Sequence, residues 1–249
     1  MKMEIFVLGV GDAYSEKHNP TSFVINSSGN YTLVECPDRL RKILREFRDI
    51  SKRSTDIKDI NDVIITHLHG DHSNGLEAFG FWKRFIENKK PRVYSIKEVF
   101  EGIWENKLKA GMERIYTKNF WVKEVSFDFY FKPKILEFEK INEVNNLNIE
   151  VKKTKHNLPC FAIKVNGDLG YSSDTYFDEE LIEFLSPCKM IIHETGPGIH
   201  TDYKELVKLP KPIKQKIYLA HLSDNFDYVN SELKILEEGK IYKFEARKF

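Results

Sequence analysis

The residues of this chain that are best suited to chemistry lie at positions 67–72, in the pattern H-x-H-x-D-H. Neutral imidazole and carboxylate groups are suitable ligands for Zn²⁺ and similar divalent ions. Without a cation between them, several such groups in one short loop would repel and desolvate one another. The pattern therefore predicts a metal site at His67, His69, Asp71 and His72 rather than a polar surface turn.

The elements expected around this motif indicate that further residues join it. An apolar run at 62–65 predicts a strand that leads directly to His67. Other residues that lie at or just beyond the end of an apolar or β-branched run are His156, Asp174, His193 and His221. Ligand sites often form where strands end, because loops converge there while the strands stay rigid. One such histidine would be an ordinary packing residue, but this many in one chain indicate a shared site.

Strand-like and helix-like runs alternate along the chain, which predicts an α/β fold. We expect strands at residues 4–8, 22–26, 31–35, 62–66, 92–94, 148–154, 161–165, 169–172, 189–192 and 216–220. We expect helices that begin at Pro37 and that cover residues 76–87, 96–111, 178–185, 201–209 and 229–238. Since no linker-like segment interrupts this order, the chain is predicted to form a single domain over residues 1–249.

The segment 96–140 differs from the rest and is treated as an insertion in that domain. Its aromatic residues include Phe120, Trp121, Phe127, Phe129, Tyr130 and Phe131. Two interpretations stay open. The rings can belong to an ordinary strand core that alternates with lysine and glutamate, or they can form a lid or a dimer contact that brings ring faces to a substrate.

Composition limits the classes to which the protein can belong. Of 249 residues, 41% are hydrophobic and 13% are aromatic, which is enough for a substantial core. The net charge of +1 predicts no general attraction to nucleic acid or anionic membranes. No apolar run is long enough to span a bilayer, and no signal peptide is expected. The three cysteines are far apart in sequence, so we expect a reducing, cytoplasmic location rather than a disulfide framework.

The H-x-H-x-D-H motif, followed in order by a histidine, an aspartate and a histidine, resembles the metallo-β-lactamase fold superfamily. The resemblance covers nearly the whole chain. It implies an αββα sandwich with a two-metal centre where the sheets meet, and hence two Zn²⁺ per chain, with Mn²⁺ or another divalent ion as the alternative. The implied ligands of the first Zn²⁺ are His67, His69 and His156. The implied ligands of the second are Asp71, His72 and His221, with Asp174 as the bridge.

Shorter matches resemble the tRNase Z-like group of that superfamily. They are residues 155–160 around the third histidine, Ser173-Asp174-Thr175 for the G-D-T step, His193-Glu194-Thr195 for the H-E-A-T element and His200-Thr201 for the H-[S/T] motif. The arm with which tRNase Z grips transfer RNA is missing, because His156 and Asp174 are too close in sequence to enclose it. The likeness is therefore to the group's small phosphodiesterases, which open cyclic phosphates and are commonly homodimers.

This likeness implies a catalytic set of Asp71, His200 and Glu194. A hydroxide shared by two metal ions would attack phosphorus, and the ions would neutralise a phosphoryl oxygen. Asp71 would ligate a metal and accept a hydrogen bond from the hydroxide. His200 would give a proton to the departing alkoxide, which is typically worth about 10²–10⁴ in rate. Glu194 would orient His200 or a ligand. Alternatively, His200 is a surface residue that caps the following helix.

The leading hypothesis is a dinuclear zinc phosphodiesterase that acts on a small cyclic phosphate, in the first place a 3′,5′- or 2′,3′-cyclic nucleotide. The alternatives are a tRNase Z-like RNA endonuclease, and a lactonase or thioester hydrolase on the same metal centre. The missing arm and the near-neutral charge argue against nucleic acid as a partner, because long RNA is bound through phosphate contacts along a basic track. A lactonase needs no dedicated histidine at position 200. We expect the protein to act as a homodimer.

Overall fold

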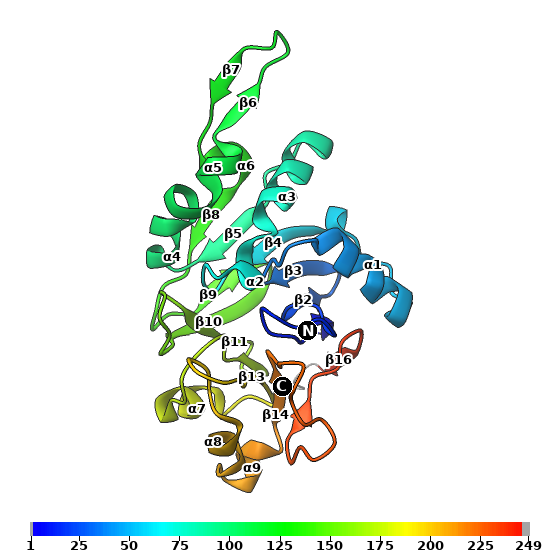
Figure 1. Cartoon of the computed structure of the whole chain (residues 1–249), viewed down its shortest axis with the longest axis vertical. Coiled ribbons are helices and arrows are strands. Elements are labelled where there is room, and N and C mark those ends of the chain that lie inside the picture. Colours follow the sequence, from blue (N-terminus) through cyan, green and yellow to red (C-terminus); the bar gives the residue numbers. More distant parts are fainter. Residues whose placement is uncertain (1, 246–249) are drawn as a thin grey trace.

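The computed structural model describes residues 2–245, and in this part of the chain two seven-stranded mixed sheets lie at the centre (Figure 1). The first sheet has the order β16 (Ile241–Phe244), β1 (Met3–Gly9), β2 (Ser22–Ser27), β3 (Asn30–Val34), β4 (Ile60–Ile64), β5 (Arg92–Ser95) and β8 (Lys132–Ile135). The second has the order β15 (Lys234–Ile235), β14 (Ile217–Ala220), β13 (Met190–Glu194), β12 (Leu169–Tyr171), β11 (Phe161–Val165), β10 (Leu147–Lys153) and β9 (Asn142–Val144). Half of the pairings in each sheet are parallel.

Helices lie outside the two sheets, with α1 and α3 beside the first sheet and α7 to α9 beside the second (Figure 1). Their bounds are α1 (Leu40–Ser51), α2 (Gly70–Ser73), α3 (Leu76–Phe81), α4 (Lys97–Gly102), α5 (Lys109–Met112), α6 (Phe127–Tyr130), α7 (Glu179–Leu185), α8 (Tyr203–Val207) and α9 (Lys211–Lys214). A 3₁₀ turn (Ile57–Asp59) precedes β4, and π-helical turns follow α3 (Trp82–Ile86) and α4 (Ile103–Leu108). This arrangement confirms the predicted αββα sandwich.

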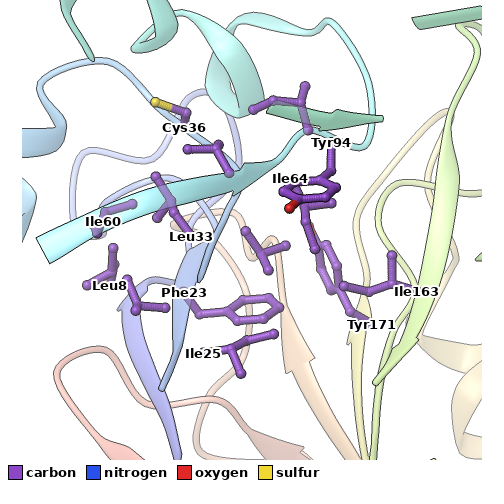
Figure 2. Close-up of a cluster of buried hydrophobic side chains, with 14 of the residues drawn as sticks. Leu8, Phe23, Ile25, Leu33, Cys36, Ile60, Ile64, Tyr94, Ile163 and Tyr171 are labelled. Carbon is purple, nitrogen blue, oxygen red and sulfur yellow. The ribbon is translucent and has the colours of Figure 1, made fainter. Parts of the chain in front are cut away.

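The core between the sheets is formed by apolar side chains that face one another (Figure 2). Phe23 of β2 and Tyr171 of β12 are fully buried, and their rings meet edge to face with 5.2 Å between centroids. Ile163 of β11 lies beside Tyr171 (Figure 2). Burying one such side chain contributes about 1.5–3 kcal/mol, so these contacts stabilise the packing of one sheet on the other.

The parallel strands place the ends of several elements at one edge. β3 and β4 of the first sheet run parallel, as do β12, β13 and β14 of the second. Thr66 after β4 and Ser173 after β12 are joined by a hydrogen bond of 2.7 Å between their hydroxyls. Loops from both sheets therefore meet at the carboxyl ends of these strands, which is where the predicted site residues occur.

Two details of the predicted helices are wrong. The first helix begins at Leu40 rather than Pro37, because Arg39 adopts a left-handed conformation with φ of 61°. The helix predicted over residues 229–238 is absent. Its second half contains β15, which pairs with β14, and the Asp227 carboxylate accepts hydrogen bonds from the backbone of Val229 and Asn230. Such side-chain acceptors stabilise a loop in competition with helix formation.

The two interpretations of residues 96–140 apply to different parts of that segment. Tyr130 and Phe131 are buried and belong to the core. A separate hairpin, β6 (Arg114–Tyr116) and β7 (Val122–Glu124), projects from one end of the molecule (Figure 1). At its tip, Phe120 and Trp121 are 86% and 74% exposed. A strand core is therefore wrong for the hairpin, and a contact role there stays a prediction.

Within residues 2–245, no helix combines the length and the apolar composition that a membrane span requires.

Candidate metal centre and active site

The H-x-H-x-D-H segment forms the turn from β4 into α2. His67 is fully buried just after β4, His69 precedes α2, and Asp71 and His72 lie within that helix. The hydroxyl of Ser73 donates a hydrogen bond of 2.7 Å to the carbonyl of His69, which fixes the turn. Because α2 is only one turn long, its polar side chains stay close to the histidines that precede it.

One group of ligand atoms forms around His69. Its Nδ1 lies 3.1 Å from Nε2 of His67 and 3.1 Å from Nε2 of His156, which follows β10. Oδ2 of Asp174 lies 3.6 Å from Nε2 of His67 and 4.0 Å from Nε2 of His156. Two nitrogen ligands on one tetrahedral zinc are about 3.3 Å apart, so this group has the spacing that a zinc ion requires.

A second group of ligand atoms forms around Asp71. Its Oδ2 lies 3.2 Å from Nε2 of His72 and 3.2 Å from Nε2 of His221, which follows β14. Asp174 reaches this group as well, with Oδ1 3.4 Å from Nε2 of His72 and Oδ2 3.6 Å from Nε2 of His221. The Asp174 carboxylate thus lies between the two groups and contacts both.

The buried polar atoms of these groups fit a divalent cation. Among the described residues, Nε2 of His72 and Oδ1 of Asp174 lie 3.4 Å apart within the second group and are buried without a hydrogen bond. The carboxylates near His72 are within ion-pair distance of it but lack hydrogen-bond geometry. Leaving buried polar atoms unsatisfied costs about 1–3 kcal/mol each. Imidazole and carboxylate ligands around these atoms therefore indicate a site for a divalent metal.

At His67, His156 and Asp174 the electrostatic environment favours the protonation states that can bind metal. Burial and the neighbouring imidazoles hold the pKa of His67 well below its ordinary value. Burial lowers the pKa of His156 to about 4, so both rings are neutral near pH 7. At Asp174, burial is outweighed by the imidazoles around it, with His221 the strongest, and the pKa of the carboxyl is lowered. Neutral imidazoles and an ionised carboxylate are the states that metal binding needs.

His200 lies at the edge of these groups and is held by Glu194. Oε2 of Glu194 is 3.2 Å from Nδ1 of His200, and Oδ2 of Asp174 is 3.8 Å from the same nitrogen. The other oxygen of Glu194 accepts hydrogen bonds of 3.0 Å from the backbone N–H groups of Thr175 and Thr201. The carboxylate of Glu194 therefore links the loop that carries Asp174 to the loop that carries His200.

Three residues in or next to the ligand groups have an unusual backbone conformation. Glu35 after β3, Ser173 after β12 and His221 after β14 have φ values of 63°, 50° and 57°. Left-handed conformations of non-glycine residues cost about 1–3 kcal/mol each and collect at functional sites, where the surrounding structure holds them in place. The loops at this sheet edge are thus constrained to bring their side chains together.

Sequence reasoning missed Glu35. Its Oε1 lies 3.3 Å from Nδ1 of His72, and its carboxylate accepts hydrogen bonds from the backbone and hydroxyl of Thr66 and from the hydroxyl of Tyr171. A signal was present in the sequence, because Glu35 ends an apolar run in the same way as the residues that were identified.

The structure brings most of the predicted site residues together at this edge. They are His67, His69, Asp71, His72, His156, Asp174, Glu194, His200 and His221. His193 is buried and directly precedes Glu194 in the sequence, but its Nδ1 lies 2.7 Å from the carbonyl of Glu194. Among the described residues, it belongs to none of the ligand groups. Such an arrangement can bind divalent ions, polarise an ester oxygen and supply a proton from one side.

Solved structures with the same fold support this interpretation of the architecture. The metallo-β-lactamase fold protein YhfI from Bacillus subtilis aligns with a TM-score of 0.75 and 15% identity, over 98% of this chain and 100% of that chain. A diphosphatase from the PhnP family aligns with a TM-score of 0.71 and 14% identity, over 98% of each chain. The metallo-β-lactamase fold that the histidine motif implied is therefore confirmed.

Sequence comparison assigns the chain to a narrower family. The Anti-Pycsar protein Apyc1 of Paenibacillus sp. (strain J14) is 28% identical and aligns with 97% of this chain and 99% of its own length. The family model described as Anti-Pycsar protein Apyc1 matches residues 3–242. Because that match covers nearly the whole length, the chain belongs to the Anti-Pycsar protein Apyc1 family and is a metal-dependent hydrolase with the metallo-β-lactamase fold.

Proposed function

We propose that this protein is a dinuclear zinc phosphodiesterase that opens a small cyclic phosphate, in the first place a cyclic nucleotide. The observation that carries the proposal is the position of Asp174, whose carboxylate contacts both ligand groups and lies 3.8 Å from His200. Membership of the Apyc1 family supports the choice of substrate, because enzymes of that family degrade cyclic nucleotides.

The two ligand groups would hold two zinc ions, with Asp174 in contact with both. The first ion would be held by His67, His69 and His156. The second would be held by Asp71, His72 and His221. When bound, such a pair lowers the pKa of a water molecule toward neutrality and neutralises charge on the phosphoryl group.

His200 is the general acid in this proposal. Its Nδ1 lies within ion-pair distance of Oε2 of Glu194, at 3.2 Å, and this contact would orient the ring so that Nε2 is presented to the leaving oxygen. The imidazole is 17% exposed, which allows contact with a substrate while Glu194 keeps the ring in one orientation. A ribose oxygen that leaves without a proton is a poor leaving group, so this proton transfer lowers the barrier.

Asp71 would orient the attacking water. Although burial raises its pKa, the contacts with His72 and His221 outweigh burial and hold the pKa of Asp71 below its ordinary value. An ionised carboxylate can only accept hydrogen bonds, so it holds a water molecule with its hydrogen toward Asp71 and a lone pair toward phosphorus. Asp71 and His200 would thus act on opposite partners of the reaction, the nucleophile and the leaving group.

The proposal is tested by presenting the purified protein with a panel of 3′,5′- and 2′,3′-cyclic nucleotides, a precursor transfer RNA and a lactone. We expect hydrolysis of a cyclic nucleotide, and we expect His200→Ala to lower kcat by about 10²–10⁴. Metal content, measured in parallel, should be the same in both proteins, because His200 is placed outside the proposed ligand set.

Three outcomes would contradict the proposal. Cleavage of the lactone alone, at a rate that His200→Ala leaves unchanged, would make carbon-ester chemistry the function. If the protein cleaves precursor transfer RNA and hydrolyses no cyclic nucleotide, it would be an RNA endonuclease. Hydrolysis of cyclic nucleotides by His200→Ala at the unmutated rate would remove the general acid role.

We also propose that the protein acts as a homodimer in the cytoplasm. The hairpin of β6 and β7 carries exposed aromatic residues, Tyr116, Phe120 and Trp121, and such a patch favours contact with another protein surface. Cys36, Cys160 and Cys188 are buried free thiols, a state that a reducing compartment maintains.

A further inference from the structure

Two cavities adjoin the candidate metal centre. One, of about 600 Å³, is lined by His200 together with the loop after β13, the start of α8 and the loop after β14. The other, of about 690 Å³, reaches the centre at Gly70 and Asp71. Each has the volume of an ordinary small-molecule site, so size alone does not decide which one receives the body of a substrate.

The chemistry of ring opening distinguishes the two cavities. When a 3′,5′-cyclic phosphate is opened, a bond forms from the water oxygen to phosphorus and the bond from phosphorus to O3′ breaks. The water passes one proton by way of Asp71 to solvent, and O3′ gains one from His200, which takes up a proton from solvent afterwards. O3′ stays attached to the ribose, so the ribose and the base lie on the His200 side of the phosphorus. Resting on the proposed function, we propose that the cavity beside His200 is the nucleoside site of the enzyme.

The charge of the two linings agrees with this assignment. Among the described residues that line the cavity beside His200 are the carboxylates of Asp202 and Asp227, and no lysine or arginine. Lys17, Arg39 and Lys42 line the other cavity, together with carboxylates. Carboxylates repel a phosphate but not an uncharged nucleoside. The phosphate is therefore directed to the metal centre while the cavity beside His200 receives the neutral part of the substrate.

Two aromatic rings in the wall of this cavity can hold a base. Phe226 and Tyr203 are half-buried and meet edge to face with 5.6 Å between ring centroids. The Tyr203 hydroxyl accepts a hydrogen bond of 2.7 Å from the backbone of Glu232, and Phe226 also contacts the ring of Tyr228 at 5.4 Å. These contacts keep the rings in place before a ligand arrives. Stacking of a base on such a ring is worth about 1–3 kcal/mol.

The distance between the general acid and these rings is fixed by a short segment of backbone. Thr201 follows His200 and donates its backbone N–H to Glu194 at 3.0 Å. Asp202 then caps α8, because its carboxylate accepts a hydrogen bond from a backbone N–H in the first turn. Tyr203 is the first residue of that helix. A ribose held between His200 and the rings would thus have its O3′ positioned by the stacking of its base.

The experiment compares two substrates that share the phosphate ring. One is 3′,5′-cyclic AMP, and the other is the 3,5-cyclic phosphate of methyl β-riboside, which has no base. Phe226→Leu keeps the apolar volume but removes the flat ring. We expect it to raise KM for cyclic AMP about tenfold and to leave KM for the base-free substrate within about twofold. Phe226→Tyr, which restores a ring, should return KM for cyclic AMP to nearly the unmutated value.

Control measurements distinguish base stacking at Phe226 from a loss of folding and from binding in the second cavity. Thermal unfolding of Phe226→Leu checks that the loop still folds, and Lys42→Met probes the other cavity. Equal effects of Phe226→Leu on both substrates would overturn the inference, and so would a rise in KM for cyclic AMP that occurs only with Lys42→Met. If the unmutated enzyme opens neither cyclic phosphate, the proposed function fails and the inference fails with it. Failure of the proposed function is distinguished from failure of the inference alone, because the unmutated enzyme is measured on both substrates first.

Discussion

Glu35 faces one ring nitrogen of His72 while the other ring nitrogen faces the ligand groups. Nδ1 of His72 lies 3.3 Å from Glu35, and Nε2 lies 3.2 Å from Asp71. A metal-binding histidine usually donates its second N–H to a carboxylate, which fixes the tautomer and the orientation of the ring. Glu35 is itself held by Thr66, so it positions His72 from a rigid support.

Replacing Glu35 with glutamine tests this positioning role at the residue scale. Glu35→Gln keeps the size of the side chain but offers His72 a weaker, uncharged acceptor. We expect zinc affinity to fall about 10- to 100-fold, measured by competition with a chromophoric chelator. Glu150→Gln is the matched control, because Glu150 pairs with Lys164 on the surface of the second sheet. Equal zinc affinity in the two variants would show that His72 needs no support from Glu35.

At the scale of a secondary-structure element, β13 carries a buried titratable group at its end. Burial lowers the pKa of His193 to about 4, against an ordinary value of 6.5. As pH falls below 6.5, the unfolded chain therefore takes up a proton that the folded chain does not. The contribution of neutral His193 to stability is complete above pH 6.5, decreases as pH falls toward 4, and changes little below that value.

The variant His193→Gln isolates this effect because glutamine does not titrate. The measurement is the free energy of unfolding in urea from pH 7 to pH 4, on chelator-treated protein so that metal release contributes nothing. We expect the difference between unmutated protein and variant to shrink by up to about 3 kcal/mol over that range. A difference that stays constant with pH would mean that His193 is not buried in its neutral form.

For the whole molecule, the candidate metal centre joins loops from both sheets, so metal binding should stabilise the entire fold. An ion that binds only the folded state at a thousand times its Kd adds about 4 kcal/mol. We expect a chelator to lower Tm by roughly 10 °C in scanning calorimetry. Added Zn²⁺ should restore Tm, whereas Mg²⁺ should not, because imidazole ligands suit zinc better. A Tm that is insensitive to the chelator would argue against a metal held between the sheets.

The hairpin of β6 and β7 allows the quaternary structure to be tested. Phe120→Ser combined with Trp121→Ser removes the exposed aromatic tip without touching the core. If the tip forms the dimer contact, its loss should weaken self-association about a hundredfold or more, since buried aromatic residues dominate most interfaces. Light scattering after size exclusion would report the mass, with Tyr14→Ser, a change at another exposed aromatic residue, as the control. A dimer that persists in the double variant would exclude the tip as the contact.

Residues 67–72 could be assigned to metal chemistry without a structure because contiguous residues carry their own spacing. A short loop cannot separate His67, His69 and His72 widely, whatever the fold around it does. The strand ends at His156 and His221 were also visible, since apolar runs are a local property of the chain. From these features a metal site at a sheet edge could be anticipated, whereas the αββα sandwich and the assignment of ligands to two ions came from the resemblance to the metallo-β-lactamase fold superfamily.

Other features depended on contacts between segments that are distant in sequence, and only the folded chain reveals such partners. Apolar periodicity predicted a helix over residues 229–238, but backbone pairing with β14 outweighed that local preference. The same periodicity could not tell that Tyr130 packs into the core while Trp121 stays exposed. Glu35 beside His72, and the rings that face the cavity at His200, depend on which loops meet at the sheet edge. Local patterns indicate where strands and apolar runs occur, whereas the packing of the whole chain decides which of these residues are buried and which side chains they contact.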